Sequence, residues 1–545
     1  MCYFCKTNPT PMSTLKDELC AELDKRVSDR ILEQTNAELL KKLIINADSD
    51  NEAMMIAELG TTYKRTGLHF DKRIERMTSD IHYFKKNNEL SFSSDDHKPA
   101  HKLIIGDNYE ALQNLLIQYK SLIDVIYIDP PYGKDSMGEF AKTNYNNAIT
   151  RDNLLSMLFP RLMLAKKLLS SRGVIFCSID DKNYAYVKCL FDEIFGENNF
   201  VGTLIWQSAT DNNPRQISIE HEYIICYSSN IDNLDKWLKK SEKAALIEQK
   251  YQELKTKYPD IETLQTILRE WIKANKDNLS GVTHYNNVDE KGVYSNSSNS
   301  SNTKPGGYTF DIIHPVTHKP CVKPEFGWRW TEETFWNYDK NGDIEWGKDE
   351  TKQPHVKKRI ETVDEKLKSV YYEDGRVATK LLESIFGVKK IFDNPKPINL
   401  ISKLIEYASE EDSIVLDFFA GSGSTGQAAL ELNRTFILCQ KNEITETTPN
   451  GIAYDVTAKR LKRIMTGECY DHSTDFDWIK KNKPYGGSLD VYEIGSVKNN
   501  EKTKGKTPFD VIDETLYGCK KFKTLKEKIE WVCTNFCNTQ KQAED

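Results

Sequence analysis

Four consecutive residues, Asp129-Pro130-Pro131-Tyr132, combine the groups that are needed to hold a planar amine. The carboxylate of Asp129 and the carbonyl of Pro130 can each accept one of its hydrogen bonds, and the ring of Tyr132 can stack on the ring that carries it. Two such acceptors draw the nitrogen lone pair out of conjugation, which makes the amine a better nucleophile. A plain strand-to-turn exit with a helix-capping Asp explains the same four residues, so a second signal must support the chemistry.

The residues before this tetrapeptide predict where it lies. Residues 125–128 form an apolar, β-branched run that is typical of a buried strand. Two prolines without an N–H group then end the strand. Because ligands of open α/β sheets bind at the carboxyl ends of the strands, the tetrapeptide is predicted to be a stiff loop at the ligand-binding edge.

The second signal is the segment 414–426, Ile-Val-Leu-Asp-Phe-Phe-Ala-Gly-Ser-Gly-Ser-Thr-Gly. It predicts a strand, then a glycine turn, then a helix. Gly421 and Gly423 allow positive φ and a close approach of the backbone to a ligand. The N-terminus of the following helix favours an anionic group such as a carboxylate. No Gly-Lys-Ser/Thr follows, so this is not a Walker loop, and the spacing departs from a dinucleotide fingerprint.

Together, the two motifs resemble the DNA amino-methyltransferases that use S-adenosyl-L-methionine, and their order resembles the β group of that family. The resemblance covers residues 101–230 and 390–465. It implies an α/β, Rossmann-like fold with circularly permuted motif order, and methyl transfer to the N6 amine of an adenine flipped out of double-stranded DNA. Asp129 favours adenine, because the N4-cytosine group usually carries Ser there. The length, the long segment between the motifs and the helical ends resemble the modification (Mod) subunit of a type III restriction–modification system.

The resemblance also assigns roles to single residues. Catalysis falls to Asp129, Pro130, Pro131 and Tyr132. His221 and Tyr223, in a His-Glu-Tyr-Ile segment, would wall the pocket of the flipped base, although both also suit an ordinary strand. The implied cofactor-binding residues are Asp107, Asn394, Lys396, Asp417, Phe419, Ala420, Gly421, Gly423, Thr425, Gln440 and Glu443.

Two of these cofactor assignments are open. Asp107 has the position of a helix N-cap, and both roles can hold together. Gln440 stands where the family usually has the acid that holds the ribose, and Glu443 follows three residues later, so either can be the ribose ligand. The mechanism needs no metal and no covalent intermediate.

Hydrophobic periodicity and composition divide the chain into five segments. These are a helical N-terminal arm (1–100), two α/β segments (101–230 and 385–470), an inserted α+β segment (231–384) and a C-terminal accessory region (471–545). The resemblance implies that 101–230 is the catalytic half on the target-base side, 231–384 the target-recognition domain and 385–470 the cofactor half. Strand–helix alternation in the catalytic half predicts a doubly wound parallel sheet, and its last two strands suit an antiparallel pair.

Three further stretches bear on recognition. Residues 134–150 are polar and suit a mobile lid over the target base. The inserted segment interleaves aromatic and basic residues, which suits either DNA contact or the core of a small β-rich domain. The basic residues at 459–463 lie on a predicted helix and suit phosphate contact or a solvated face.

The composition narrows the class of protein. The 545 residues carry a formal net charge of −7, so a DNA reader of this size must concentrate its positive charge locally. The 12 scattered cysteines favour reduced thiols in the cytoplasm over a disulfide framework. No signal peptide or membrane-spanning run is evident, and Cys2-x-x-Cys5 lacks a second pair for zinc. Expected partners are double-stranded DNA, a second copy of the chain in a homodimer, and a restriction (helicase–nuclease) subunit.

Other functions fit the same motifs. An N4-cytosine or stand-alone DNA methyltransferase would use the same fold, as would an RNA or protein-glutamine methyltransferase. A catalytically silent DNA-binding subunit is the non-enzyme alternative, which two intact motifs disfavour.

Overall fold

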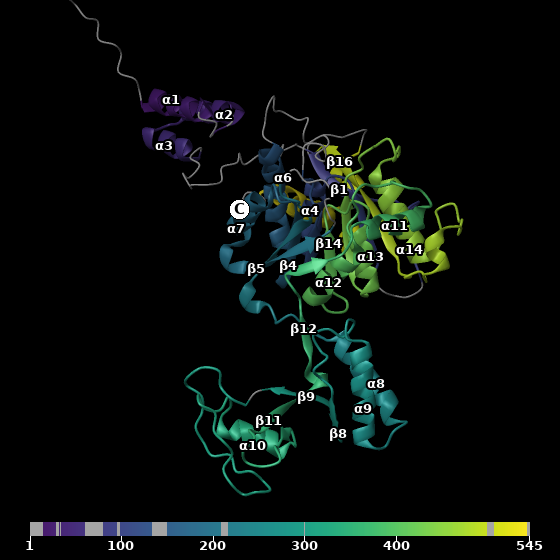
Figure 1. The fold of residues 1–545 in the computed structure, drawn as a ribbon. Helices are drawn as coiled ribbons and strands as arrows, with labels where there is room; N and C mark the ends of the chain where they lie inside the picture. The colour runs from purple at the N-terminus through teal and green to yellow at the C-terminus, as the bar shows by residue number, and fades with distance from the viewer. Residues whose placement is uncertain are drawn as a thin grey trace, which may run out of the picture. The chain divides into compact units, whose positions relative to one another are not determined.

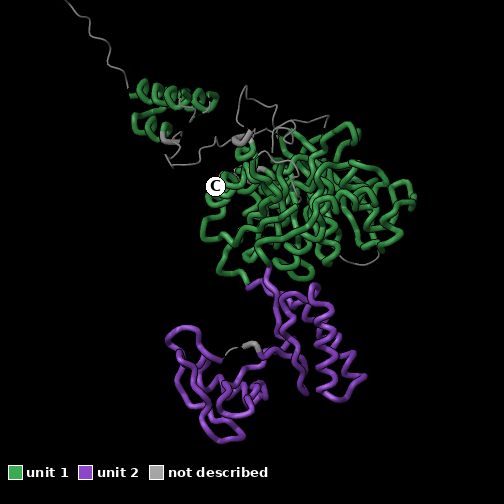
Figure 2. Tube along the Cα trace, in the orientation of Figure 1, with its two compact units in different colours: residues 1–235, 368–545 green, residues 236–367 purple. Residues whose placement is uncertain are grey.

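A computed structural model of the chain describes residues 15–28, 32, 34–59, 80–94, 99–132, 150–208, 216–298, 300–498 and 506–541. The chain forms two compact units, residues 1–235 with 368–545 and residues 236–367 (Figure 2). The inserted unit is therefore shorter than the expected 231–384, because β13 (Val370–Tyr372) pairs with a strand of the first unit. Cys2, Cys5 and all but the last residue of the expected lid lie outside the described residues.

The first unit is built on a sheet of ten strands (Figure 1). In sheet order the strands are β1 (Asp80–Lys86), β16 (Leu489–Lys498), β2 (His101–Ile105), β15 (Thr435–Gln440), β14 (Ile414–Asp417), β3 (Ile123–Ile128), β4 (Leu169–Ile179), β6 (His221–Ser228), β5 (Phe200–Gln207) and β13. Strands β16 to β4 run parallel, whereas β1 and β6 are antiparallel to their neighbours. The α/β fold is confirmed, and so is the antiparallel pairing of β5 with β6.

Helices cover both faces of the sheet, as its buried parallel strands require. Ile126 and Ile128 of β3 belong to one core with α4 (Asn108–Tyr119), α6 (Thr150–Leu168) and α7 (Tyr184–Phe195). Side chains alternate along a strand, so Val125 and Tyr127 face the other way. On that side α12 (Ile398–Ala408) contacts β3 and packs against α13 (Ser424–Glu431), and α13 contacts α14 (Lys459–Thr466) and β15.

Both ends of the chain depart from the expected segments. Helices α1 (Leu15–Ser28), α2 (Gln34–Asn46) and α3 (Asp50–Leu59) form the expected helical layer around their own small core. Residues 80–86, however, are a strand, and residues 489–498 are a strand of the same sheet rather than part of an accessory region. The two strands pair although about 400 residues separate them, which local patterns do not reveal.

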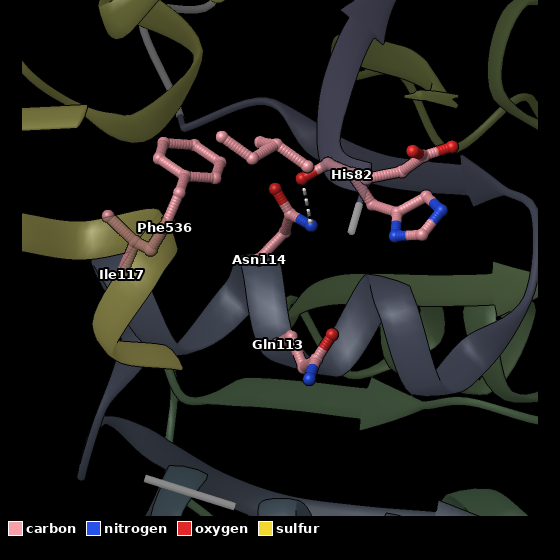
Figure 3. A pocket seen from close by; sticks show the side chains of 7 residues that line it. His82, Gln113, Asn114, Ile117 and Phe536 are labelled. Atoms are coloured by element: carbon pink, nitrogen blue, oxygen red, sulfur yellow. Dashed lines mark hydrogen bonds between the residues drawn. The ribbon is translucent and has the colours of Figure 1, made fainter. Parts of the chain in front are cut away.

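The C-terminal residues complete this edge of the unit. They include α15 (Pro508–Val511) and α16 (Leu525–Lys541). The hydroxyl of Tyr517 donates to Asn114 Oδ1 of α4 at 2.7 Å and accepts from the Phe84 amide at 2.8 Å. A pocket of about 20 Å³ lies beside these residues, lined by Asn114, Ile117 and Phe536 (Figure 3). It has room for about one water molecule and not for a substrate.

The second unit has two cores of its own. Helices α8 (Glu242–Lys255) and α9 (Ile261–Ala274) form one core with β8 (Asn287–Asp289) and β9 (Gly292–Ser298). The other contains α10 (Glu332–Lys340), β10 (Ile344–Glu345) and β11 (His355–Arg359). Strands β10-β11-β9-β8 form an antiparallel sheet, and β7 (Leu238–Lys240) pairs with β12 (Asp364–Lys366).

Most aromatic residues of this unit are structural. Trp328 and Phe335 are buried with other rings packed on them, whereas Tyr308 and Phe326 keep 50% and 37% of their surface exposed. Arg359, one of the interleaved basic residues of this segment, is buried and donates to Asp289 and Asp343.

Two further findings concern the described part of the chain. None of its helices is both long and apolar enough to span a membrane. Its cysteines are free thiols, and Cys177, Cys226 and Cys439 are buried in strands, as the sequence suggests.

Candidate functional site

The two sequence motifs meet at one edge of the central sheet. Strands β3 and β14 are parallel neighbours, with Val125 opposite Val415 and Ile126 opposite Leu416. The proline loop after β3 and the glycine loop after β14 therefore leave the sheet side by side. Asp417, at the end of β14, has a buried carboxyl group whose pKa is raised mainly by burial. The charge of Asp129 is close enough to add to this rise.

The proline loop is fixed by hydrogen bonds on both sides of Tyr132. Its carbonyl accepts from Asn183 Nδ2 at 2.8 Å, next to the start of α7. Its hydroxyl donates to Asp129 Oδ1 and lies 3.3 Å from Glu222 Oε2. Burial, and then the charges of Asp129 and Glu222, raise the pKa of Tyr132 well above its usual value. The hydroxyl therefore remains a neutral donor.

A buried lysine joins this loop from the segment before α12. The side chain of Lys396 is 7% exposed, and its Nζ lies 2.9 Å from Asp129 Oδ2 and 3.1 Å from Glu222 Oε2. It also lies 3.2 Å from the hydroxyl of Tyr132. Burial disfavours the ammonium, but the two carboxylates outweigh it and raise the pKa of Lys396. The resemblance assigns Lys396 to the cofactor, whereas the geometry places its ammonium on the proline loop.

Glu222, which lies between the two residues predicted for the base pocket, is a site residue that the sequence pattern did not reveal. Tyr223 stacks on Tyr184 with ring centroids 4.2 Å apart, and its hydroxyl donates to Asp181 at 3.2 Å. His221 meets the edge of the Tyr223 ring. Alternation along β6 turns residues 221 and 223 to one face and Glu222 to the other, where it meets Lys396 and Tyr132. The signal that could have indicated Glu222 is an acidic residue inside an otherwise apolar strand at the ligand-binding edge.

The glycine loop has the backbone that its residues predict. Gly421 has φ +50° and Gly423 has φ +81°, in the left-handed region that favours glycine. The Gly421 amide donates to Gln440 Oε1 at 2.6 Å, and the Ala420 amide donates to the Cys439 carbonyl at 3.1 Å. Among the described residues no side chain caps α13, so its N-terminus lacks a side-chain acceptor.

The carboxyl group of Asp417 ties this loop together from inside. It accepts from the Phe419 amide at 2.8 Å and from the Thr425 hydroxyl at 2.6 Å. Asp417 is 2% exposed. Burial is the main cause that raises its pKa to about 7; the two hydrogen bonds oppose the shift and the charge of Asp129 adds to it.

A second missed residue, Arg460 of α14, lies beneath the loop. Its guanidinium donates to the Ser422 carbonyl at 3.1 Å and to the Ser424 hydroxyl at 3.2 Å. The residue is 1% exposed, and burial lowers its pKa to about 10. Arg460 therefore supports the loop from the interior, unlike the phosphate contact or solvated face that its helical pattern suggests.

The other cofactor candidates spread along the same edge. Asp107 caps α4 as predicted, accepting from the Tyr109 amide at 2.9 Å, and pairs with the buried Arg161 at 2.9 Å. Gln440 is bound to the glycine loop through its own side chain. Asn394 is exposed with φ +51°, and Glu443 follows β15. Their contacts with a cofactor stay predictions, and so does the choice of ribose ligand.

The α/β fold, the proline and glycine loops, and the charged cluster of Asp129, Glu222 and Lys396 together indicate a class of protein, and the family match identifies it. Residues 123–448 match the DNA methylase family, and the chain therefore belongs to that family. A second family match, to an uncharacterised conserved protein, covers residues 17–124.

The relatives described next each align with about two thirds of this chain. The EcoP15I Mod subunit of a type III restriction–modification enzyme from Escherichia coli is 35% identical over 67% of this chain and 63% of its own length. The StyLTI Mod subunit of Salmonella typhimurium is 28% identical over 68% of this chain and 58% of its own length. The type II methyltransferase M.KpnI of Klebsiella pneumoniae is 29% identical over 69% of this chain and 89% of its own length. The chain thus spans about three fifths of the length of the two Mod subunits.

Proposed function

We propose that this chain is a site-specific DNA methyltransferase that transfers a methyl group from S-adenosyl-L-methionine to the N6 amine of a flipped adenine. The single observation that carries the proposal is the meeting of two loops at adjacent strand ends. One loop carries the carboxylate of Asp129, and the other carries Gly421 and Gly423 with positive φ. An amine and a methyl donor bound there would lie next to each other.

The glycine loop fits the proposed cofactor. Positive φ at Gly421 and Gly423 brings backbone close to a ligand, and the uncapped N-terminus of α13 suits the carboxylate of a methionine moiety. Asp417 and Gln440 border the same loop. When bound, S-adenosyl-L-methionine supplies an electrophilic methyl group on a sulfonium.

The proline loop performs the work on the base. Flipping the base costs a few kcal/mol, and stacking on Tyr132 offsets about 1–3 kcal/mol of that cost. Asp129 and the Pro130 carbonyl accept the two amine hydrogens and hold the nitrogen in line with the methyl group. Catalysis is then mainly positioning, which needs no metal.

We further propose that the chain is the modification and recognition subunit of a type III restriction–modification system. The similarity to two Mod subunits supports this, and residues 236–367 would read the DNA sequence. A restriction subunit and a second copy of the chain are its proposed protein partners. A stand-alone methyltransferase is the second candidate, because the chain spans 89% of M.KpnI. Co-purification of a helicase–nuclease with the chain separates the two.

The experiment is methyl transfer from isotope-labelled S-adenosyl-L-methionine to DNA, followed by identification of the modified base and its sequence. N6-methyladenine at a fixed sequence supports the proposal, and labelled cytosine overturns the choice of adenine. Asp129→Asn should abolish transfer. Asp490→Asn is the matched control, since it removes a carboxylate that pairs with Lys86 at 2.6 Å on another strand pair. Equal activity of the two variants would remove Asp129 from the mechanism.

A further inference from the structure

Both oxygens of the Asp129 carboxylate already have donors. Oδ1 accepts from the Tyr132 hydroxyl, and Oδ2 lies 2.9 Å from the Lys396 ammonium. The proposed reaction requires the same carboxylate to receive an amine hydrogen. A carboxylate can accept further hydrogen bonds, but an ammonium 2.9 Å from Asp129 Oδ2 would lie close to an amine bound to the same group, and positive charge develops on that amine during methyl transfer, so the ammonium beside Asp129 opposes the reaction. Lys396 must therefore move toward another partner.

The other partner is Glu222. Its Oε2 lies 3.1 Å from Lys396 Nζ, nearly as close as Asp129 Oδ2. Because the lysine side chain is only 7% exposed, water cannot replace a lost carboxylate. The Tyr132 hydroxyl lies within reach of both carboxylates, at 3.3 Å from Glu222, so it can follow the ammonium.

We propose that Glu222 is a positioning residue that holds Lys396 away from Asp129 when the target amine enters. The inference rests on the proposed function and assigns a role that the motifs leave open. Asp129 and Glu222 both pair with the buried ammonium of Lys396. When the amine binds Asp129, the ammonium pairs with Glu222 instead. Without Glu222, Asp129 is the single carboxylate partner that the ammonium has among the described residues, and the ammonium remains there.

Double substitution separates this role from simple structural support. Glu222→Gln should lower kcat at saturating DNA and cofactor by about tenfold or more, with unchanged affinity for S-adenosyl-L-methionine. Lys396→Met should also be impaired, because it leaves two neighbouring carboxylates without a cation. The double variant removes both the ammonium and its second partner, so its kcat should exceed that of Glu222→Gln by about tenfold. If Glu222 and Lys396 only supported the fold, the losses in kcat of the two single variants would instead add in the double variant.

A matched control tests for general destabilisation. Glu514 pairs with Lys528 at the same distance, 3.1 Å, and its side chain is 8% exposed. Glu514→Gln should lower thermal stability and leave kcat unchanged. If Glu222→Gln does not fold, Glu222→Asp, which keeps the charge on a shorter arm, should still show reduced kcat with normal cofactor affinity.

The outcomes are decisive in both directions. The inference is overturned if Glu222→Gln keeps the kcat of the wild-type chain, or if the double variant is no more active than Glu222→Gln. In either case, methyl transfer by the wild-type chain would still uphold the proposed function. Absence of methyl transfer by the wild-type chain overturns both.

Discussion

The carboxyl group of Asp417 should make the chain less stable as the pH approaches neutrality. Its pKa is about 7 in the folded chain against an ordinary value of 3.8, so the folded state binds more protons between these values. The stabilisation is complete below about pH 4 and is lost as the pH rises through about 7. The rise of the Asp417 pKa from 3.8 to about 7 corresponds to roughly 4 kcal/mol of stability.

Asp417→Asn removes this dependence without removing the hydrogen bonds. The amide oxygen can accept from the Phe419 amide, and the amide nitrogen can donate to the Thr425 hydroxyl. We expect the variant and the wild-type chain to be equally stable near pH 4. At pH 8 the variant should be more stable by up to roughly 4 kcal/mol. Urea unfolding of both chains from pH 4 to pH 8, followed by circular dichroism, measures the difference.

Asp455 supplies a contrast of opposite sign. Burial opposes its charge, but Lys459 at 2.8 Å and the Asn450 amide at 2.8 Å outweigh burial and lower its pKa. Its stabilisation is present above pH 4 and is lost as the pH falls. Asp455→Asn should therefore be less stable than wild type at neutral pH. Equal pH slopes for Asp417→Asn and wild type would refute the burial argument for Asp417.

Three other predictions concern the glycine loop and the inserted unit. Gly421→Val should weaken S-adenosyl-L-methionine binding about tenfold, because a Cβ there would lie 3.0 Å from Phe392 Cζ at positive φ; calorimetric titration with unchanged affinity would contradict it. Exchange of residues 236–367 for those of a relative should change the methylated sequence but not the methylated atom, and sequencing that finds the original site would move recognition elsewhere. Arg359→Met should destabilise that unit by about 2 kcal/mol, because Asp289 and Asp343 lose a buried charged donor while Asp289 keeps Lys357 at 2.8 Å; unchanged protease resistance would count against this.

The two motif loops and their strands were predictable because their signals are local. Residues 125–128 and 414–417 are apolar runs that end at prolines or glycines, and such runs specify a buried strand and its exit without reference to the rest of the chain. The antiparallel strands β5 and β6 are separated by a polar loop rather than a helix, which excludes a parallel crossover.

The rest depended on contacts between distant residues. The pairing of β1 with β16 joins the two ends of the chain, and nothing in residues 80–86 indicates that partner. Lys396, Glu222 and Asp129 likewise come from three separate segments and meet only in the folded sheet. The resemblance had assigned Lys396 to the cofactor. A buried ammonium needs carboxylates, and only the fold shows which ones are within reach.

The two glycines of the loop belong to one motif but face different surroundings, so substitutions at them test different properties. A side chain at Gly423 would point inward, with its Cβ 3.4 Å from Thr457 Cγ2 and 3.8 Å from Arg460 Cδ. A side chain at Gly421 would instead meet Phe392, in the segment that also carries Lys396. Substitution at Gly423 therefore tests the support beneath the loop. Substitution at Gly421 tests the surface between the glycine loop and the segment before α12, where the proposed methyl donor and the proline loop must come together.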